Sequence, residues 1–576
     1  MLIADGQCLP QRFTPGTDRQ EAMMSHPNGP RTGRPPTYAS HGVVSTPHYL
    51  ASAAGLNILQ HGGSAVDAAI AANAVLCVVY PHMAGLGGDG FWLIAEPQTG
   101  SVHGINASGP SARTATLDYY RSRSKDGEIP ARGPLSVLTV PGAIDGWRLA
   151  HERFGRLAWD ELFQAAIEYA REGMPVTRSL ADWTAQDEPI LDAYPATAAI
   201  FLPDARVPRE GQRLVQADLA DSLQQIASQG ARNGFYEGDI AERICAALQA
   251  EGSPLAAEDF DAFHAEWFEP ITGSYRGYEV YQLPPSTQGF AAIQILNLIE
   301  GYDVVAWGEG TADYYHHMAE AVKIAFADRE EWLTDPSFVN IPVQQLISKA
   351  YADERRRLID PERALDIAQV PPGIAFEHPH EKRAPEGDTC YFCAADRDGM
   401  VVSLISSIYH DFGSAVVGGD TGILLQNRGA FFALDEKHPN CLHPGKRTFH
   451  TLIPALLAKD GKPYLAYGSM GGEGQPQSQA AMVTRIVDFG YDVQQAIEAP
   501  RWLMGRTWGT RTRNLSLEGR ISDEVARELK RRGQPVQMVT DWNDNLGHAQ
   551  AIRVNREQGF YEGGADPRGD GAALGY

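Results

Sequence analysis

Residues 387–396 read GDTCYFCAAD, and the rest of the chain is best interpreted outward from this stretch. It follows a segment rich in proline and charge, residues 361–388, and it precedes an Arg-Asp-Gly turn at residues 397–399 with a second β-prone run behind it. Gly, Asp and Pro mark turns, whereas β-branched and aromatic residues favour strands. The pattern predicts a linker that leads into a buried β-hairpin, with Thr389 at its first position.

Thr389 is the residue in this stretch with the most distinctive chemistry. A threonine hydroxyl is a poor nucleophile at its ordinary pKa and needs an adjacent base. An N-terminal threonine carries such a base in its own α-amine, whose pKa is about 7.7 to 8.0. A cut between Asp388 and Thr389 would therefore make Thr389 nucleophile and base together.

Eight further blocks support a family resemblance, and they follow one another in the family's order. The blocks are GGSAVDAAIAANAV (62–75), GLGGDGF (85–91), LPPSTQGFAAIQILNLIE (283–300), MAEAVKIAFADREEWLTDP (318–336), TGILLQNRGAFF (421–432), PGKRTFHTLIP (444–454), GSMGG (468–472) and GHAQAI (547–552). Together with residues 387–396 they make the chain from Ala39 to Tyr576 resemble the γ-glutamyltransferase family of N-terminal-nucleophile (Ntn) hydrolases.

The resemblance implies an inactive precursor that cleaves itself between Asp388 and Thr389. Residues 39–388 then form a large subunit, residues 389–576 form a small catalytic subunit, and residues 1–38 precede them as a disordered extension. The implied fold is α+β, an αββα four-layer sandwich built by both subunits together. Long helices alternating with β-rich segments agree with two central sheets covered by helices.

The resemblance also assigns catalytic roles. The backbone N–H groups of Gly471 and Gly472 are expected to bind the oxyanion, and glycine lets a backbone approach a substrate closely. A simple turn at Gly468–Gly472 is the alternative. Ser407 stands where the family has a threonine whose hydroxyl orients the nucleophile. Because Ser407 keeps that hydroxyl, an active enzyme is favoured over a non-catalytic scaffold.

The substrate pocket departs from the family pattern. The family's arginine for the glutamate α-carboxylate has no counterpart in residues 105–110, and Phe431 replaces the aspartate that holds the α-amino group. Tyr409 replaces an asparagine, and His450-Thr451 replaces a pair of serines. Both charged contacts to a γ-glutamyl head group are therefore expected to be missing.

Arg428 is a gain at a position where the family has glutamine. A guanidinium pairs with a carboxylate through two parallel hydrogen bonds. The pocket therefore favours a donor with a carboxylate and no ammonium, which resembles the branch of oxamate amidohydrolases and glutaryl-type cephalosporin acylases. The alternative is that Arg428 pairs with a structural acid.

Composition excludes some partners. The net charge of −23 repels nucleic acids and anionic lipid surfaces, so neither is expected as a partner. The six cysteines have no disulfide spacing, and the N-terminus lacks the apolar run of a secretory signal; a cytoplasmic protein is expected, with translation starting at Met1, Met23 or Met24. Neither a cofactor nor a metal is expected, and a higher oligomer is left open.

Three other patterns are interpreted as structural. Residues 85–90 match G-x-G-x-x-G, but a helix precedes the glycines and a strand follows, the reverse of a dinucleotide site. His316, His317 and Glu320 lack a distant third ligand for zinc, so helix surface or core packing is favoured. Cys390 and Cys393 point to opposite faces of a strand, which favours ordinary packing. Residues 110–275 are expected to be mostly helical scaffold.

The sequence therefore predicts a self-maturing amidohydrolase that acts through an acyl-enzyme on a small carboxylate-bearing amide. Glutathione hydrolysis or γ-glutamyl transfer is the alternative within the same class. A non-catalytic scaffold is a further, different class.

Overall fold

The computed structural model describes residues 32–124, 127–376, 387–505 and 512–576. Thr37–Ala39 already form β1, and Thr37 and Tyr38 pair with Gly563 and Glu562. The ordered chain thus begins before the expected boundary at Ala39. The expectations for residues 1–31, including Cys8 and the two internal start methionines, lie outside the described residues.

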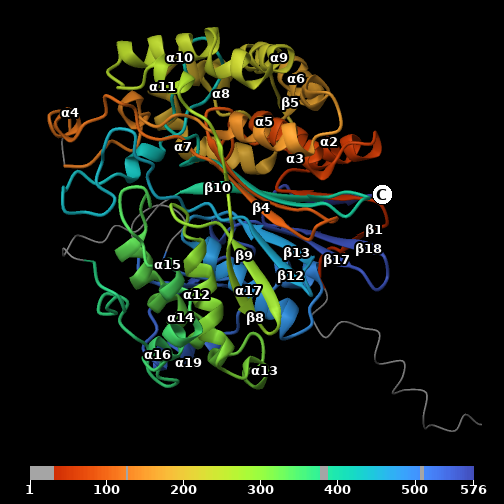
Figure 1. Cartoon of the computed structure of the whole chain (residues 1–576), viewed down its shortest axis with the longest axis vertical. Helices are drawn as coiled ribbons and strands as arrows, with labels where there is room; N and C mark the ends of the chain where they lie inside the picture. Colours follow the sequence, from red (N-terminus) through yellow and green to blue (C-terminus); the bar gives the residue numbers. More distant parts are fainter. Residues whose placement is uncertain (1–31, 125–126, 377–386, 506–511) are drawn as a thin grey trace, which may run out of the picture.

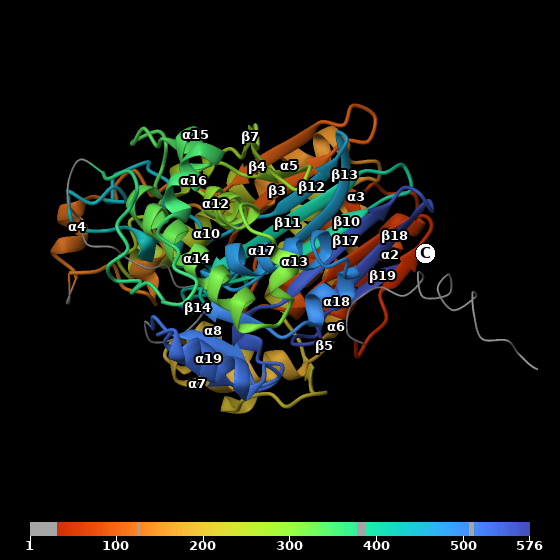
Figure 2. The same ribbon diagram turned by 90° about the horizontal axis from the view of Figure 1, so that it is seen from below.

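Two seven-stranded sheets face each other at the centre of the described chain (Figures 1 and 2). Sheet I contains, in spatial order, β19 (Ala572–Gly575), β2 (Val43–Thr46), β10 (Asp388–Ala395), β11 (Val401–Tyr409), β3 (Asp89–Ala95), β4 (Val102–Ala107) and β7 (Glu266–Phe268). Sheet II contains β1, β18 (Phe560–Ala565), β17 (Ala549–Asn555), β13 (Lys462–Ser469), β12 (Ala455–Lys459), β9 (Tyr278–Gln282) and β8 (Ile271–Tyr275).

Both sheets mix strands from the two sides of the Asp388-Thr389 bond. In sheet I, β10 lies between β2 and β11, and β11 pairs in turn with β3. Two smaller sheets lie outside this centre. They are formed by β14 (Trp502–Met504), β15 (Leu515–Glu518) and β16 (Val536–Val539), and by β5 (Met174–Pro175) and β6 (Arg213–Leu214).

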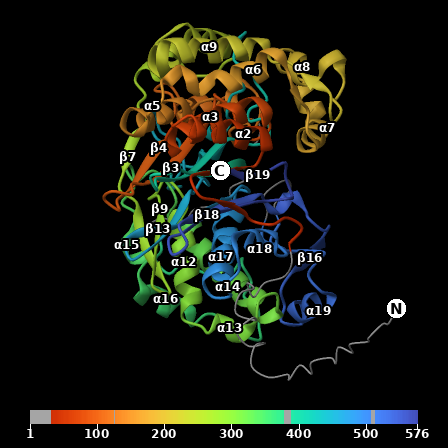
Figure 3. The ribbon, with the colours of Figure 1, turned by 90° about the vertical axis from the view of Figure 1, so that its right-hand side faces the viewer.

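Helices cover the outer face of each sheet, which gives four layers (Figures 1 and 3). The layer on sheet I, with the helices packed beyond it, contains α2 (Tyr49–Gln60), α3 (Ala65–Val79), α4 (Leu117–Arg121), α5 (Ala143–Phe154), α6 (Gln164–Glu172), α7 (Arg178–Asp192), α8 (Pro195–Phe201), α9 (Ala217–Ala231), α10 (Asp239–Ala250) and α11 (Ala257–Asp261). The layer on sheet II contains α12 (Gly289–Glu300), α13 (Val304–Trp307), α14 (Ala312–Trp332), α15 (Val343–Leu346), α16 (Lys349–Arg356), α17 (Gly474–Val487), α18 (Val493–Glu498) and α19 (Asp523–Arg531). The expected αββα sandwich is confirmed.

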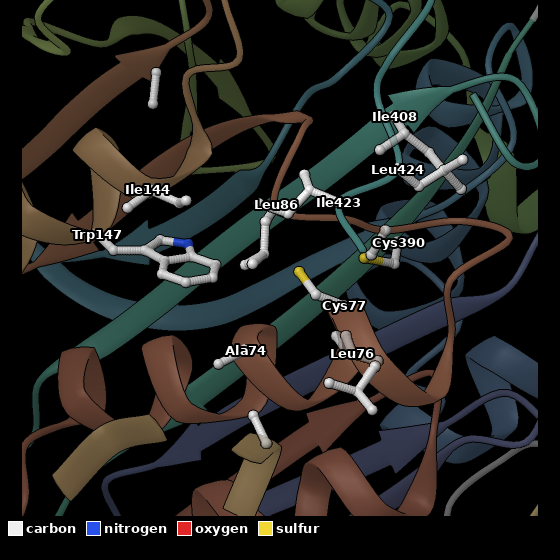
Figure 4. Packing of buried hydrophobic residues seen from close by; sticks show 14 of the residues in the cluster. Ala74, Leu76, Cys77, Leu86, Ile144, Trp147, Cys390, Ile408, Ile423 and Leu424 are labelled. Carbon is white, nitrogen blue, oxygen red and sulfur yellow. The ribbon is translucent and has the colours of Figure 1, made fainter. Parts of the chain in front are cut away.

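The strand β10 contributes side chains to two separate hydrophobic cores, one on each face of sheet I. Successive side chains of a strand point to opposite faces. Cys390 packs with the helices on sheet I, whereas Tyr391 and Cys393 pack in the layer between the two sheets. Figure 4 shows the helix side, with Cys390 close to Cys77 of α3. Cys390 and Cys393 therefore lie on opposite faces of the strand and do not form a pair with each other.

The buried helix α3 follows the sequence prediction closely. Ser64 caps it, and the Asp67 carboxylate accepts from the Ser64 backbone N–H over 2.9 Å, completing a capping box. Every residue of α3 is buried, which explains its continuous apolar character. The glycines of residues 85–90 form the turn from this helix into β3, so their structural interpretation is confirmed.

His316, His317 and Glu320 are buried residues of α14. His316 Nε2 bonds the Asp360 carbonyl, and Glu320 accepts from Lys323 Nζ over 2.7 Å. Core packing is therefore the correct interpretation of this cluster, rather than a helix surface. Within the described ranges, no helix combines the length and the apolar character that a membrane crossing requires.

Candidate active site

Thr389 lies opposite an irregularity of β11, where two residues, Ser407 and Ile408, face this one residue of β10. Asp388 pairs with Tyr409 and Cys390 pairs with Ser406, so the register shifts by one residue between them. Such bulges turn a side chain away from the regular pleat and are common beside active sites. Thr389 is fully buried and shares the inter-sheet face with Tyr391. The candidate nucleophile is thus held by the geometry of an inner strand.

Ser407 lies on the neighbouring strand β11, within this bulge. Its Oγ accepts hydrogen bonds from the Tyr409 backbone N–H at 2.8 Å and from Arg428 Nη2 at 3.1 Å. A hydroxyl has two acceptor positions and one proton. Because both acceptor positions are filled, Ser407 can act on a neighbouring group only as a hydrogen-bond donor.

The glycine loop follows β13 and precedes α17. Gly471 and Gly472 both have positive φ, +111° and +44°, which side chains disfavour. A Cβ on Gly472 would lie 2.8 Å from the Gly387 carbonyl oxygen. The loop therefore lies directly against the backbone that precedes the candidate cleavage point. The N-terminus of α17 adds a partial positive charge here.

Three polar side chains that the sequence analysis did not single out hold this loop. Gln475 places Nε2 3.5 Å from Thr389 Oγ1 and accepts from the Ile453 N–H at 3.0 Å. Gln288 Nε2 donates to the carbonyls of Gly472 at 2.9 Å and Thr451 at 2.7 Å.

Arg329 is the third of these side chains, and it donates from Nη1 to Gln288 Oε1 at 3.1 Å. Gln288 and Arg329 lie inside two of the quoted sequence blocks, and Gln475 comes three residues after GSMGG. Their positions in or beside these blocks were the only sequence signal for a role in the site. Spacing along the chain, however, does not show which side chains contact one another.

The substrate-pocket candidates Tyr409, Arg428 and Phe431 meet beside Ser407. The Arg428 guanidinium carbon lies 4.6 Å from the Tyr409 ring centre and 5.4 Å from that of Phe431. Phe431 stacks between Tyr409 and Phe449, each at 4.2 Å. Among the described residues, these contacts place the Arg428 guanidinium against two aromatic rings beside Ser407.

Arg428 is fully buried, and its Nε and Nη1 have no hydrogen-bond partner among the described residues. Burial lowers the pKa of Arg428 to about 10, while nearby Asp89 opposes that shift. Arg428 forms no ion pair with a carboxylate whose side chain the structure describes. Buried donors in native proteins are almost always satisfied. Two guanidinium nitrogens with unsatisfied N–H groups beside the candidate nucleophile indicate a place for an anionic ligand.

His450 and Thr451 lie on the same side of the site. Neither ring nitrogen of His450 nor the Thr451 hydroxyl has a hydrogen-bond partner among the described residues. Burial holds the pKa of His450 well below its ordinary value, so its imidazole is neutral. His450 Nε2 is 3.7 Å from Asp89 Oδ2.

Residues 105–110 contain no arginine, but another arginine reaches them. Arg447 Nε donates to the Ser108 carbonyl at 3.0 Å, and its Nη2 lies 3.4 Å from Glu266. These contacts engage Arg447 with the rim of sheet I. Sequence alignment of short blocks could not show this approach from a distant segment.

Two facing sheets covered by helices are the fold of the Ntn hydrolase class. In this chain a buried threonine lies on an inner strand of sheet I, with a glycine loop opposite. The sequence model of one family, described as Gamma-glutamyltranspeptidase, matches residues 51–576. The chain belongs to this family. The resemblance deduced from the quoted blocks is thereby confirmed.

Individual relatives extend over nearly the whole chain. A glutathione hydrolase-like YwrD proenzyme of Bacillus subtilis is 48% identical over 533 residues, 92% of this chain and 98% of its own length. An oxamate amidohydrolase proenzyme of Klebsiella pneumoniae is 41% identical over 543 residues, 93% and 99% of the two chains. The crystal structure of a cephalosporin acylase from Bacillus halodurans superposes with a TM-score of 0.87 at 37% identity, covering 96% and 98%. The expectation of an enzyme related to hydrolases and acylases is confirmed.

Proposed function

We propose that this protein is a self-cleaving N-terminal-threonine amidohydrolase that acts on small amides bearing a carboxylate. The observation that carries the substrate class is Arg428, a buried guanidinium that contacts Ser407 and keeps two nitrogens, Nε and Nη1, without a described partner. The proenzyme names of the two relatives support maturation into two subunits of one precursor.

In the proposed maturation, Thr389 Oγ attacks the carbonyl carbon of Asp388 and the peptide bond becomes an ester. The bond between the Asp388 carbonyl carbon and the Thr389 nitrogen breaks in this step, which frees the α-amine of Thr389. Water then hydrolyses the ester, which frees the Thr389 hydroxyl and leaves Asp388 with a C-terminal carboxylate. The contact between Gly472 and Gly387 supports this step, because it brings candidate oxyanion donors to the peptide that must be cleaved.

In the proposed reaction, Thr389 Oγ attacks the substrate's amide carbon while its α-amine takes the hydroxyl proton and passes it to the leaving amine. The N–H groups of Gly471 and Gly472 stabilise the oxyanion, and Ser407 donates to the nucleophile oxygen. Water then hydrolyses the ester to the free acid. Arg428 binds the carboxylate, and the aromatic wall of Tyr409 and Phe431 shapes the acyl pocket. His450 and Thr451 complete that pocket.

Glutathione hydrolysis is the second candidate, and Asp89 is the observation that favours it. This buried carboxyl lies close to His450, and its Oδ2 accepts no hydrogen bond from a described residue, so it could receive a donor's ammonium group. One experiment separates the two candidates. Purified enzyme is assayed side by side with oxamate, a glutaryl amide, a γ-glutamyl anilide and glutathione; highest kcat/KM for the two substrates without an amine supports the proposal, and highest kcat/KM for glutathione contradicts it.

The cellular location is proposed on separate grounds. Cys77, Cys245, Cys393 and Cys441 are free and buried, as is usual in a reducing compartment, which supports a cytoplasmic enzyme.

A further inference from the structure

Asp89 belongs to a row of polar side chains that crosses three strands. It is the first residue of β3, and it is the register partner of Ser407 on β11, which lies opposite Thr389 of β10. Phe91 and Leu93 of the same strand face the inter-sheet layer, so the alternation places Asp89 on that face as well. The chain thus buries a carboxyl two strands away from its candidate nucleophile.

The two oxygens of Asp89 have different surroundings. Oδ1 accepts from the Gly142 N–H at 3.2 Å and from Gln426 Nε2 at 3.1 Å. Oδ2 has no hydrogen-bond partner among the described residues and faces His450 Nε2 at 3.7 Å. A fully buried carboxylate with one unsatisfied oxygen is costly, so the proton is the readiest partner for Oδ2.

Arg428 and Asp89 influence each other without direct contact. Burial raises the pKa of Asp89 to about 7, and the Arg428 charge opposes this shift. The other titratable or charged groups that face Asp89 or Arg428 come from several elements: His450, Arg447 beyond it, Tyr409 against the guanidinium and Tyr236 of the helical layer. Of these, His450 stays neutral because burial depresses its pKa.

We propose that Asp89 is a positioning residue that sets specificity by acting as the replaceable counter-charge of Arg428: a substrate carboxylate binds Arg428 together with one proton, which Asp89 Oδ2 takes from solvent. This inference rests on the proposed function. The charge is balanced in this binding step, because one anion and one proton enter the site together. No covalent bond of the substrate changes. Two carboxylates cannot both stay ionised near one buried guanidinium at low dielectric, so the incoming anion requires Asp89 to be neutral.

The consequence is a KM that depends on pH for charged substrates alone. Below a pH of about 7 Asp89 already holds its proton, and the carboxylate binds without a penalty. Above that pH, the ionised fraction of Asp89 grows, and KM for a carboxylate substrate should rise by up to about tenfold per pH unit. An uncharged substrate does not meet this penalty.

The kinetic test uses mature enzyme with glutaryl p-nitroanilide and with its methyl ester between pH 6 and 9. For the wild type, KM of the acid should rise with pH, whereas KM of the ester should stay constant. Asp89→Asn should hold KM of the acid at its low-pH value throughout, at least about tenfold below the wild type at pH 8.5. Asp396→Asn is the matched control, because Asp396 is a buried acid with a raised pKa at the far end of β10.

Two kinetic results would overturn the proposal. One is an Asp89→Asn enzyme that keeps the wild-type pH profile of KM. The other is an Asp89→Asn enzyme that loses activity on glutathione alone, which would make Asp89 an ammonium ligand.

A measurement on wild-type enzyme covers the case in which Asp89→Asn fails to mature. Titration calorimetry with glutarate at pH 8, in two buffers of different ionisation enthalpy, counts the protons bound with the ligand. Uptake of close to one proton supports the proposal, and binding without proton uptake overturns it while leaving the proposed function intact. Failure of glutarate to bind between pH 6 and 9 would instead overturn the proposed function, and this inference with it.

Discussion

Arg428 donates a hydrogen bond from Nη2 to Ser407 Oγ over 3.1 Å, which ties the only described cation of the aromatic pocket to the hydroxyl beside the candidate nucleophile. The Tyr409 N–H occupies the second acceptor position of the same oxygen. The Ser407 proton is therefore directed by two bonds. In the proposed mechanism, this one hydroxyl links the group that binds the substrate carboxylate to the group that orients the nucleophile.

Replacing Ser407 tests that relationship. Ser407→Ala leaves a buried Arg428 N–H without its acceptor and removes the donor toward Thr389. We expect kcat to fall by about ten- to a hundredfold, which corresponds to ~1.5 to 3 kcal/mol for a hydrogen bond to a charged group. Ser407→Thr keeps the hydroxyl and should retain most of kcat. Equal losses in the two variants, measured by steady-state kinetics, would refute the role of the hydroxyl.

In the proposed mechanism, maturation depends on Thr389 itself. We expect the wild type to run on a denaturing gel as two fragments, one of which begins at Thr389 by N-terminal sequencing. Thr389→Ala should remain one inactive chain, because no hydroxyl is present to form the ester. Thr389→Ser keeps an attacking oxygen and should still be cleaved. Cleavage of the alanine variant, or a different first residue, would show that the nucleophile lies elsewhere.

The oxyanion loop should tolerate no side chain at Gly472. Gly472→Ala places a Cβ 2.8 Å from the Gly387 carbonyl oxygen at a φ of +44°, so the loop must move away from the peptide to be cleaved. Loss of one oxyanion donor typically lowers the rate by about a hundred- to a thousandfold. We expect self-cleavage, followed on a gel over time, to slow by about that factor.

Gly490→Ala is the control for this variant. Gly490 has a similar positive φ of +70°, but no atom lies within 4 Å of its added Cβ, and it follows the far end of α17. It should mature at the wild-type rate. A Gly490 variant that is as slow as the Gly472 variant would attribute the defect to backbone strain alone.

The buried His48 should make stability depend on pH. Its Nδ1 accepts from the Leu50 N–H at the start of α2, and burial lowers its pKa to about 3. In the unfolded chain the His48 imidazole takes up a proton as the pH falls through about 6.5, whereas in the folded chain it stays neutral there. This contribution is therefore intact above pH 6.5 and is lost as the pH falls, by about 2 kcal/mol between pH 7 and pH 5.

His48→Asn removes the titration while keeping an N-cap acceptor. We expect the drop in Tm between pH 7 and pH 5 to be smaller than in the wild type by about 2 °C, given an unfolding entropy of ~2.1 cal/mol/K per residue. His61, exposed at the other end of α2, provides the control variant His61→Asn. An unchanged pH dependence of Tm in the His48 variant would contradict the linkage.

Much of the fold could be predicted from the sequence, because local chemistry determines it. The Ser64–Asp67 capping box and the unbroken apolar run behind it predict a buried helix, and the structure has α3 there. The alternation in β10 likewise predicts opposite faces for Cys390 and Cys393. These features depend on residues a few positions apart.

The active site was predictable only in part. Thr389, Ser407 and the glycine loop could be found from family blocks, whereas Asp89 looked like one residue of a turn. Its position beside Ser407 depends on the register of β3 against β11, two strands more than 300 residues apart in the chain. Gln475 and Gln288 were missed for the same reason, since no local pattern encodes contacts across layers.

Arg428 should decide which substrates are accepted. Arg428→Gln removes the positive charge together with Nε and Nη1, the two guanidinium nitrogens that lack a described partner. A hydrogen-bonded charge pair of this kind is worth ~1.5 to 3 kcal/mol, so KM for glutaryl p-nitroanilide should rise by about ten- to a hundredfold. KM for the methyl ester should change little, because the ester brings no charge to pair. Arg428→Lys keeps the charge but lacks the planar guanidinium, so its KM for the acid should lie between those of the wild type and Arg428→Gln.

Because Nη2 of Arg428 also orients Ser407, kcat of Arg428→Gln should fall for the acid and the ester by the same factor. If Arg428→Gln leaves KM of the acid unchanged, or if glutathione is the best substrate of the wild type, the pocket does not select carboxylates and the ordinary γ-glutamyl activity of the family is the better assignment.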